Sequence, residues 1–133
     1  MRFMVIVKAT KDSESGRLPK AEEFAAMHEF NEGLAKDGVL LAAEELQASS
    51  KGARMTFSPS EKPEVTDGPF AETKELIAGF WLVQAKSKAE VIERYTRCPF
   101  ENGEIEIRQV FEAEDFGEAL SPEIREFEAR RRA

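Results

Sequence analysis

The chain has 133 residues, of which 41% are hydrophobic and 34% are charged, and it carries a formal net charge of −7. This length and composition are typical of one globular domain with a packed core. The acidic balance argues against DNA or RNA binding, which needs basic surface to displace counterions from phosphates. The basic run 130–132 fits the last turn of a helix, where cations complement the helix dipole. We expect no nucleic-acid partner.

Two further features bear on the compartment. No apolar run approaches the roughly 18 residues that would cross a membrane. The apolar N-terminal stretch lacks a cleavage site, so we interpret it as a strand and not as a signal peptide. The single cysteine, Cys98, excludes an intrachain disulfide. The sequence therefore predicts a cytoplasmic protein without membrane contact.

Hydrophobic periodicity predicts strands and helices along the whole chain. Residues 3–8 and 76–85 are apolar on both faces, which is typical of strands that are covered on both sides. Residues 19–37 place apolar side chains at three- and four-residue steps, which predicts a helix that ends at Gly38. The remaining predicted elements are strands at 39–46, 53–57, 64–66 and 105–111, a polar loop at 10–17, a helix from Ser87 to before Pro99, and a terminal helix from Ser121.

This order of elements predicts an α+β fold, a ferredoxin-like antiparallel sheet with two long helices on one face. Two helices cover only one face, so the other face would expose Trp81, Ile77 and either Phe3 or Met4. We expect a second copy of the chain to cover that face, which gives a homodimer with facing sheets. The alternative is that the terminal helix folds across the face in a monomer.

One stretch suggests a family. Residues 65–75 read Val-Thr-Asp-Gly-Pro-Phe-Ala-Glu-Thr-Lys-Glu and resemble the signature of the DGPF group within the YCII-related protein family. Residues 38–42, 49–54 and 97–99 are also similar to that group. The resemblance covers roughly residues 1–112, which leaves 113–133 as a C-terminal extension with a short helix in the same domain.

The resemblance implies a dimeric α+β barrel built from ferredoxin-like subunits. It also implies a regulatory role, because members of this group often occur beside extracytoplasmic-function sigma factors. Some relatives have a histidine on the first helix and an aspartate nine residues later as a proposed catalytic pair, and the matching positions here are Met27 and Lys36. His28 lies one residue off, and that shift rotates a helical side chain by about 100°. We interpret His28 as a partly exposed helix residue.

Several residues are candidates for a functional site. Asp67 could act as a catalytic acid or base, or its carboxylate could bind backbone amides in an Asx turn. One of the neighbouring residues Glu44 and Glu45, of which we select Glu44, could point into a barrel cavity, or it could sit at the wet end of the strand. Arg54 could bind an anionic ligand, or it could pair with Glu44, Glu45 or Asp67. Phe80 and Trp81 are sheet aromatics, one of which could line a ligand pocket. One histidine and one cysteine give no metal motif, so we predict no metal and no cofactor.

The sequence supports three functions and leaves open whether the protein is an enzyme. The first is a small-molecule-binding or regulatory dimer, with a pocket lined by Trp81 or Phe80 and edged by Asp67 and Arg54. The second is an enzyme of the dimeric α+β barrel type that uses Asp67 or a strand glutamate as its acid or base. The third is a protein-interaction module linked to transcription regulation.

Overall fold

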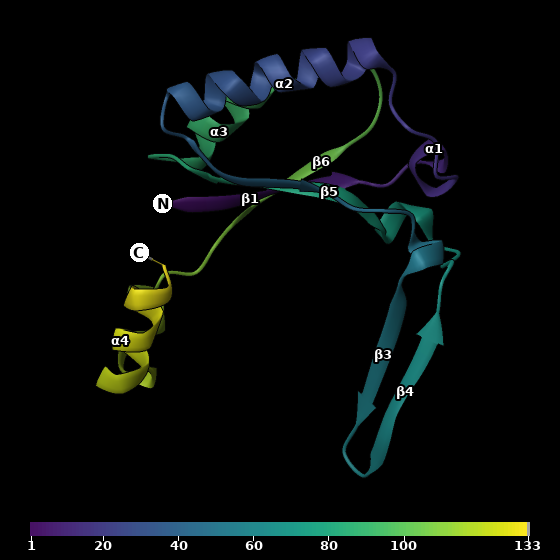
Figure 1. Ribbon diagram of the computed structural model, residues 1–133. Coiled ribbons are helices and arrows are strands. Elements are labelled where there is room, and N and C mark those ends of the chain that lie inside the picture. Colours follow the sequence, from purple (N-terminus) through teal and green to yellow (C-terminus); the bar gives the residue numbers. More distant parts are fainter. Residues whose placement is uncertain (133) are drawn as a thin grey trace.

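A four-stranded antiparallel sheet with the order β2-β5-β1-β6 lies at the centre of the molecule (Figure 1). The computed structural model describes residues 1–132, apart from the side chain of Lys74. The chain order places one helix after β1 and another after β5, and this is the ferredoxin-like arrangement that the sequence predicts. The strands are β1 (Arg2–Lys8), β2 (Leu40–Glu45), β5 (Ile77–Gln84) and β6 (Ile105–Gln109).

Helices α2 (Ala21–Lys36) and α3 (Lys88–Tyr95) cover one face of this sheet (Figure 1). After α2 the chain turns at Gly38, whose φ of 72° is the left-handed conformation that glycine adopts at little cost. Before α3 the Ser87 hydroxyl accepts a hydrogen bond from the amide of Glu90. The end of α2 and the start of α3 therefore lie where Gly38 and Ser87 predict them.

The core lies between the sheet and these two helices. Alternate residues of the two central strands point into it and are buried, and residues from α2, the turn after it and α3 complete it. The indole N–H of Trp81 donates to Asn31 Oδ1 at 2.8 Å, and the ring of Trp81 meets Tyr95 edge to face. The core residues are Phe3, Val5, Leu34, Val39, Trp81, Val83, Val91 and Tyr95.

The expectation that Trp81 lies on the uncovered face is therefore wrong. Its side chain faces α2. Ile77 lies opposite Lys8, beyond a register shift between β1 and β5, so the alternation counted from Trp81 does not extend to it. Phe3 is 1% exposed and also belongs to the helix side, whereas Met4 points to the other face. Periodicity identifies two apolar faces of such a strand but does not tell which one meets the helices.

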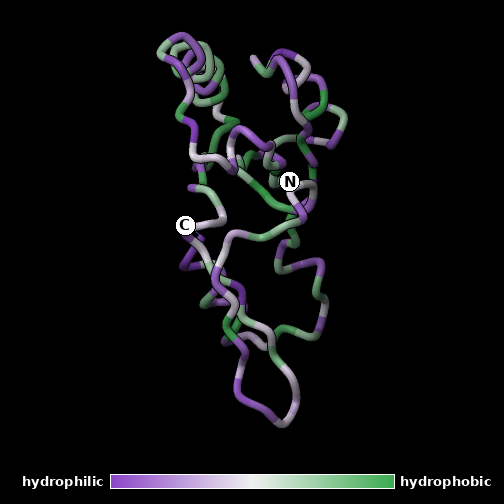
Figure 2. Tube along the Cα trace, turned by 90° about the vertical axis from the view of Figure 1, so that its right-hand side faces the viewer, coloured by the Kyte–Doolittle hydropathy of each residue, from purple (hydrophilic) through white to green (hydrophobic). Residues whose placement is uncertain are grey.

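Two further units leave the sheet on the side opposite to the helices (Figure 1). One is a two-stranded sheet, the hairpin of β3 (Ala53–Ser58) and β4 (Glu61–Asp67), inserted between β2 and β5. The other is the C-terminal unit of η3 (Ala113–Ala119) and α4 (Pro122–Arg131). Figure 2, turned by 90°, gives the same order, with α2 seen end-on at the top and the hairpin reaching the bottom. The smaller elements are α1 (Lys11–Glu14), η1 (Ser49–Lys51) and η2 (Thr73–Glu75).

The terminal helix does not fold across the sheet. Figure 1 shows α4 near the end where β1 begins, to one side of the strands. The segment predicted as a polar loop at 10–17 contains the helical turn α1, which Thr10 and Ser13 cap reciprocally. None of the helices in the described residues is both long and apolar enough to span a bilayer.

Candidate functional site

The sheet face that no helix covers, here called the open face, carries an apolar stripe. Met4 and Ile6 of β1 lie opposite Leu82 and Phe80 of β5 in the strand register. Residues directly opposite in an antiparallel pair point to the same side, so these four side chains form one contiguous surface. Each is only partly buried. The stripe lies between the hairpin and the C-terminal unit, which both project on this side (Figure 1).

Glu44 lies beside this stripe on the edge strand β2. It pairs with Phe80 in the register, so its carboxylate is on the open face, while the next pair, Ala43 and Trp81, points toward the helices. Of the four predicted pocket residues, the structure therefore brings Glu44 and Phe80 together and separates Trp81 from them.

The opposite edge of the open face carries an ion-pair cluster. The Nζ atom of Lys8 lies 3.3 Å from Glu106 Oε1, and Arg108 Nη1 donates to Glu106 Oε2 at 3.1 Å. The hydrogen bonds from Arg108 and Lys8 hold the pKa of Glu106 below its usual range. The apolar stripe is thus bordered by the Glu44 carboxylate on the β2 side and by the ion-paired cluster around Glu106 on the β6 side.

The Asp67-Gly68-Pro69-Phe70 turn is organised around Ser49 of η1. The amide of Ser49 donates to one oxygen of Glu14 at 2.9 Å, and its hydroxyl donates a short hydrogen bond to the other. The same hydroxyl accepts from the amide of Phe70 at 3.1 Å. Because Ser49 stabilises the carboxylate, the pKa of Glu14 lies below its usual range. Three segments distant in sequence are held together here.

Asp67 and Arg54 lie at the base of the hairpin. Asp67 is exposed, and its carboxylate accepts no hydrogen bond from any group that the structure describes, so the Asx turn is not formed there. The guanidinium carbon of Arg54 lies 3.9 Å from the centre of the Phe70 ring, a cation–π contact. Arg54 Nη1 is also 3.9 Å from Glu72 Oε2. A catalytic role for Asp67 stays a prediction.

His28 and Cys98 lie apart from both the open face and the turn around Ser49. His28 is exposed on α2 and its Nε2 atom lies 2.6 Å from Glu32 Oε1. Cys98 packs at the edge of the core, and burial raises the pKa of its thiol to about 11. Within residues 1–132, no three side chains of His, Cys, Asp and Glu are arranged to hold a metal ion.

Comparison with known proteins identifies the family. The model of the YCII-related domain matches residues 1–114 of this chain. The chain belongs to the YCII-related family. No curated protein matches it. A similar solved structure is 5-chloro-2-hydroxyhydroquinone dehydrochlorinase (TftG) from Burkholderia phenoliruptrix AC1100, in complex with 2,5-dihydroxybenzoquinone. The two chains are 16% identical with a TM-score of 0.42, and the match covers 86% of this chain and 98% of the other.

Sequence reasoning missed Glu14 and Ser49 in this YCII-related domain. They lie 35 positions apart, the first in a segment expected to be a loop and the second in a polar turn. The sequence around Ser49 carries no motif of a catalytic serine, because the partner of Ser49 is a distant glutamate and their contact exists only in the folded chain.

Proposed function

We propose that this YCII-related protein is a homodimer that binds a small, largely apolar molecule between two facing open faces. The observation that carries the proposal is the apolar stripe of Met4, Ile6, Phe80 and Leu82, with the Glu44 carboxylate at one edge and the ion-paired Glu106 at the other. Apolar surface around a few polar groups is the usual composition of a ligand site. The Glu44 carboxylate would accept a hydrogen bond from a hydroxyl or amine of the ligand.

A second copy is the partner that this surface favours. Facing sheets pack roughly 10 Å apart, so two open faces would remove both stripes from water. The hairpin and the C-terminal unit project on the same side and would flank the partner (Figure 1). The predicted roles of Asp67 and Arg54 then change, because both residues lie at the hairpin base and Arg54 is already in contact with Phe70. We assign ligand contact to Glu44 and Phe80.

Light scattering on the purified protein tests the dimer. We expect the mass of a dimer at micromolar concentration, and the mass of a monomer for Leu82→Glu, which places a charge in the stripe. Ile92→Glu is the matched control, because Ile92 is an exposed apolar residue on α3, which packs on the other side of the sheet. Circular dichroism verifies that both variants fold. A wild-type monomer at these concentrations contradicts the proposal.

A thermal-shift screen of small molecules tests the ligand site, since a ligand of the native state raises the melting temperature. Compounds that stabilise the wild type should lose most of their effect in Phe80→Ala and Glu44→Gln. Glu45→Gln is the control, because Glu45 pairs with Gly79 and points to the helix side. Equal ligand effects in the Glu44 and Glu45 variants would place the ligand elsewhere.

Glu44 also favours a second candidate function, an enzyme that uses this carboxylate as a general acid or base. The support is that Glu44 is a carboxylate directly beside the apolar stripe. A substrate found by the screen would be converted by the wild type and by Glu45→Gln, but not by Glu44→Gln. Turnover that survives in Glu44→Gln would leave binding alone as the function.

A further inference from the structure

The hairpin has an apolar surface that no other part of the described chain covers. Every residue of β3 and β4 is exposed, and Met55 lies directly opposite Val65 in the register. Phe57 follows two positions further along β3. Met55, Phe57 and Val65 are 56%, 72% and 58% exposed. An isolated two-stranded hairpin is only marginally stable in water, so this arm needs a surface to pack on.

The C-terminal unit carries a half-open groove of about 230 Å³ with apolar walls on one side and charged residues on the other. Its walls are Ala113, Phe116 and Leu120 from η3 and the turn after it, together with Ile124 of α4. An apolar cavity of roughly 150 Å³ is enough to hold a benzene molecule, so the groove has room for one phenyl ring. Its charged rim is formed by Glu128, Arg131 and Arg132.

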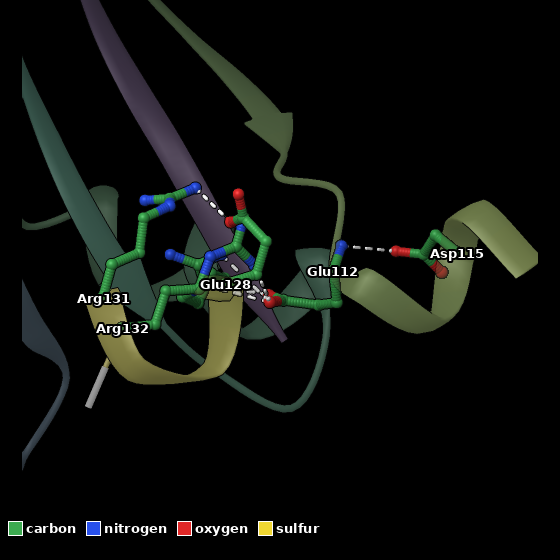
Figure 3. Close-up of polar contacts among 6 residues, drawn as sticks. Glu112, Asp115, Glu128, Arg131 and Arg132 are labelled. Atoms are coloured by element: carbon green, nitrogen blue, oxygen red, sulfur yellow. Dashed lines mark hydrogen bonds and ion pairs between the residues drawn. The ribbon is translucent and has the colours of Figure 1, made fainter. Parts of the chain in front are cut away.

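Ion pairs hold this groove in place. Glu112 accepts from Arg2 of β1 at 2.9 Å and from Arg132 at 3.1 Å, so one carboxylate joins the C-terminal unit to the sheet. Figure 3 shows the Arg131 and Arg132 side chains turned toward Glu128 and Glu112, with the amide of Glu112 bound to Asp115. Both rim arginines have carboxylate partners, so the rim offers no free cation for an anionic ligand. An apolar occupant fits the groove better.

The topology places the hairpin and the groove at opposite corners of the sheet. The hairpin follows β2 and the C-terminal unit follows β6, and these are the two edge strands. Successive antiparallel pairings make β2 and β6 run in opposite directions, so they end at opposite ends of the sheet. The two units therefore lie at diagonally opposed corners, on the same side of the sheet (Figure 1).

A two-fold axis between facing sheets can exchange these corners. The axis lies between the two sheets, parallel to them, along the diagonal that joins the two corners without a hairpin or C-terminal unit. Rotation about it brings the hairpin of each chain beside the C-terminal unit of its partner, and the strands of the two sheets then cross at a right angle. The hairpin strands have six and seven residues, which corresponds to a reach of roughly 20 Å. This reach exceeds the roughly 10 Å between packed sheets, so the arm extends past the partner's sheet.

We propose that the β3–β4 hairpin of each chain docks on the C-terminal unit of a second copy and places the Phe57 ring in the groove between η3 and α4. This contact rests on the proposed homodimer and adds which segments of its two chains pack against each other. Each chain supplies an arm and a groove, so the contact is made twice in one dimer. The arm and the groove thereby both lose their exposed apolar surface.

Disulfide trapping tests the contact. In a Cys98→Ala background, the double variant Phe57→Cys/Ile124→Cys should form a covalent dimer under mild oxidation, because the two thiols of one chain lie at opposite corners. Thr56→Cys/Ile124→Cys is the matched control, since Thr56 is the neighbouring strand position. The single variants Phe57→Cys and Ile124→Cys show whether the same position in two copies of the chain can form a disulfide. We expect strong cross-linking only in the first double variant.

A second measurement does not depend on a cysteine. Phe57→Lys should raise the dimer dissociation constant roughly a hundredfold, because two buried rings are lost in each dimer, while Thr56→Lys leaves it almost unchanged. The protein could be a dimer under reducing conditions and yet show neither the cross-link in Phe57→Cys/Ile124→Cys nor the weaker dimerisation of Phe57→Lys. That result would overturn the docking of the hairpin but not the proposed homodimer. Cross-linking of Phe57→Cys alone would mean that hairpins pair with each other, which also overturns the proposal. A monomer would remove both proposals.

Discussion

Gly68 shows at the scale of one residue why the turn at 67–70 depends on its neighbours. A Cβ atom at this position would lie 1.7 Å from the backbone oxygen of Ser49 and 2.6 Å from its carbonyl carbon. Because this obstacle is backbone, it cannot rotate away. We expect Gly68→Ala to lower the free energy of unfolding by about 3 kcal/mol, the upper part of the usual range for overpacking.

Gly33 supplies the control for this variant. It lies in the last turn of α2, with open space where a Cβ atom would be. Alanine there should raise the free energy of unfolding by up to about 1 kcal/mol, because glycine is the poorer helix former. Urea unfolding followed by circular dichroism measures both variants. A Gly68→Ala protein as stable as the wild type would refute the close approach of the turn to Ser49.

The Cys98 thiol gives a prediction on reactivity. Burial raises its pKa from 9.0 to about 11, so at pH 8 the reactive thiolate is roughly a hundredfold rarer than for an ordinary thiol. We expect slow reaction with a thiol reagent in the native protein and fast reaction in denaturant. Equal rates in the two conditions would contradict the buried position of Cys98.

The same pKa shift has a consequence for stability. The folded state keeps the thiol protonated while the unfolded chain releases its proton, so the free energy of unfolding falls as pH rises from about 9 to about 11. Cys98→Ala should flatten this part of the pH profile. Burial also raises the pKa of Tyr95 from 10.0, which leaves a further decline above about pH 10 in the variant.

At the scale of elements, Glu112 joins the C-terminal unit to the sheet through Arg2 and Arg132. The hydrogen bond from Arg2 holds the pKa of Glu112 below its usual range, so the contact exists at neutral pH and is lost as pH falls through the lowered pKa. Glu112→Gln removes a partly exposed ion pair, worth up to about 1 kcal/mol. Amide hydrogen exchange in α4 should then become about fivefold faster at pH 7.

Glu126→Gln is the control for this measurement, because Glu126 is an exposed glutamate of α4. Exchange in the central strands should stay the same in both variants, since the sheet has its own core. If α4 exchanges at wild-type rates in Glu112→Gln, the unit is held by its apolar contacts instead.

The elements themselves could largely be predicted from the sequence, because each of the two long helices and the central strands has its own periodicity and caps. The hairpin is the instructive exception. Its returning strand was expected at 64–66 but spans Glu61–Asp67 and includes Pro63. Proline lacks an amide donor, and its presence is tolerated where a strand has no neighbour on one side, as in a two-stranded sheet. Because proline usually marks the end of a strand, the sequence predicted a shorter strand than the one that forms.

The candidate site was less predictable, for a geometric reason. That Glu44 and Phe80 share a face follows from the pairing of β2 with β5, and a shift of one residue would place Glu44 beside the core instead. Likewise, the bond between Glu14 and Ser49 joins two short elements that hydrophobic patterning does not detect. The sequence predicts which strands exist, and the register decides which side chains meet.

At the scale of the whole molecule, the fold divides apolar surface between two sides. The helices cover Phe3, Val5, Trp81 and Val83, whereas the stripe of Met4, Ile6, Phe80 and Leu82 is left to the open face. The hairpin and the C-terminal unit extend from the same side and also expose aromatic residues, among them Phe57, Phe116 and Phe127. One association through this side, as in the proposed dimer, would cover all three surfaces.

This dimer predicts that thermal stability depends on protein concentration. When unfolding separates two chains, a hundredfold rise in concentration adds about 2.7 kcal/mol to the stability of the dimer, which raises the melting temperature by about 5 °C for a chain of this size. Calorimetry at about 1 and 100 µM therefore should give different melting temperatures for the wild type and for Ile92→Glu. Leu82→Glu, with a charge in the stripe, should melt at one temperature throughout. A wild-type melting temperature that is constant over this range would mean that the open face carries no association.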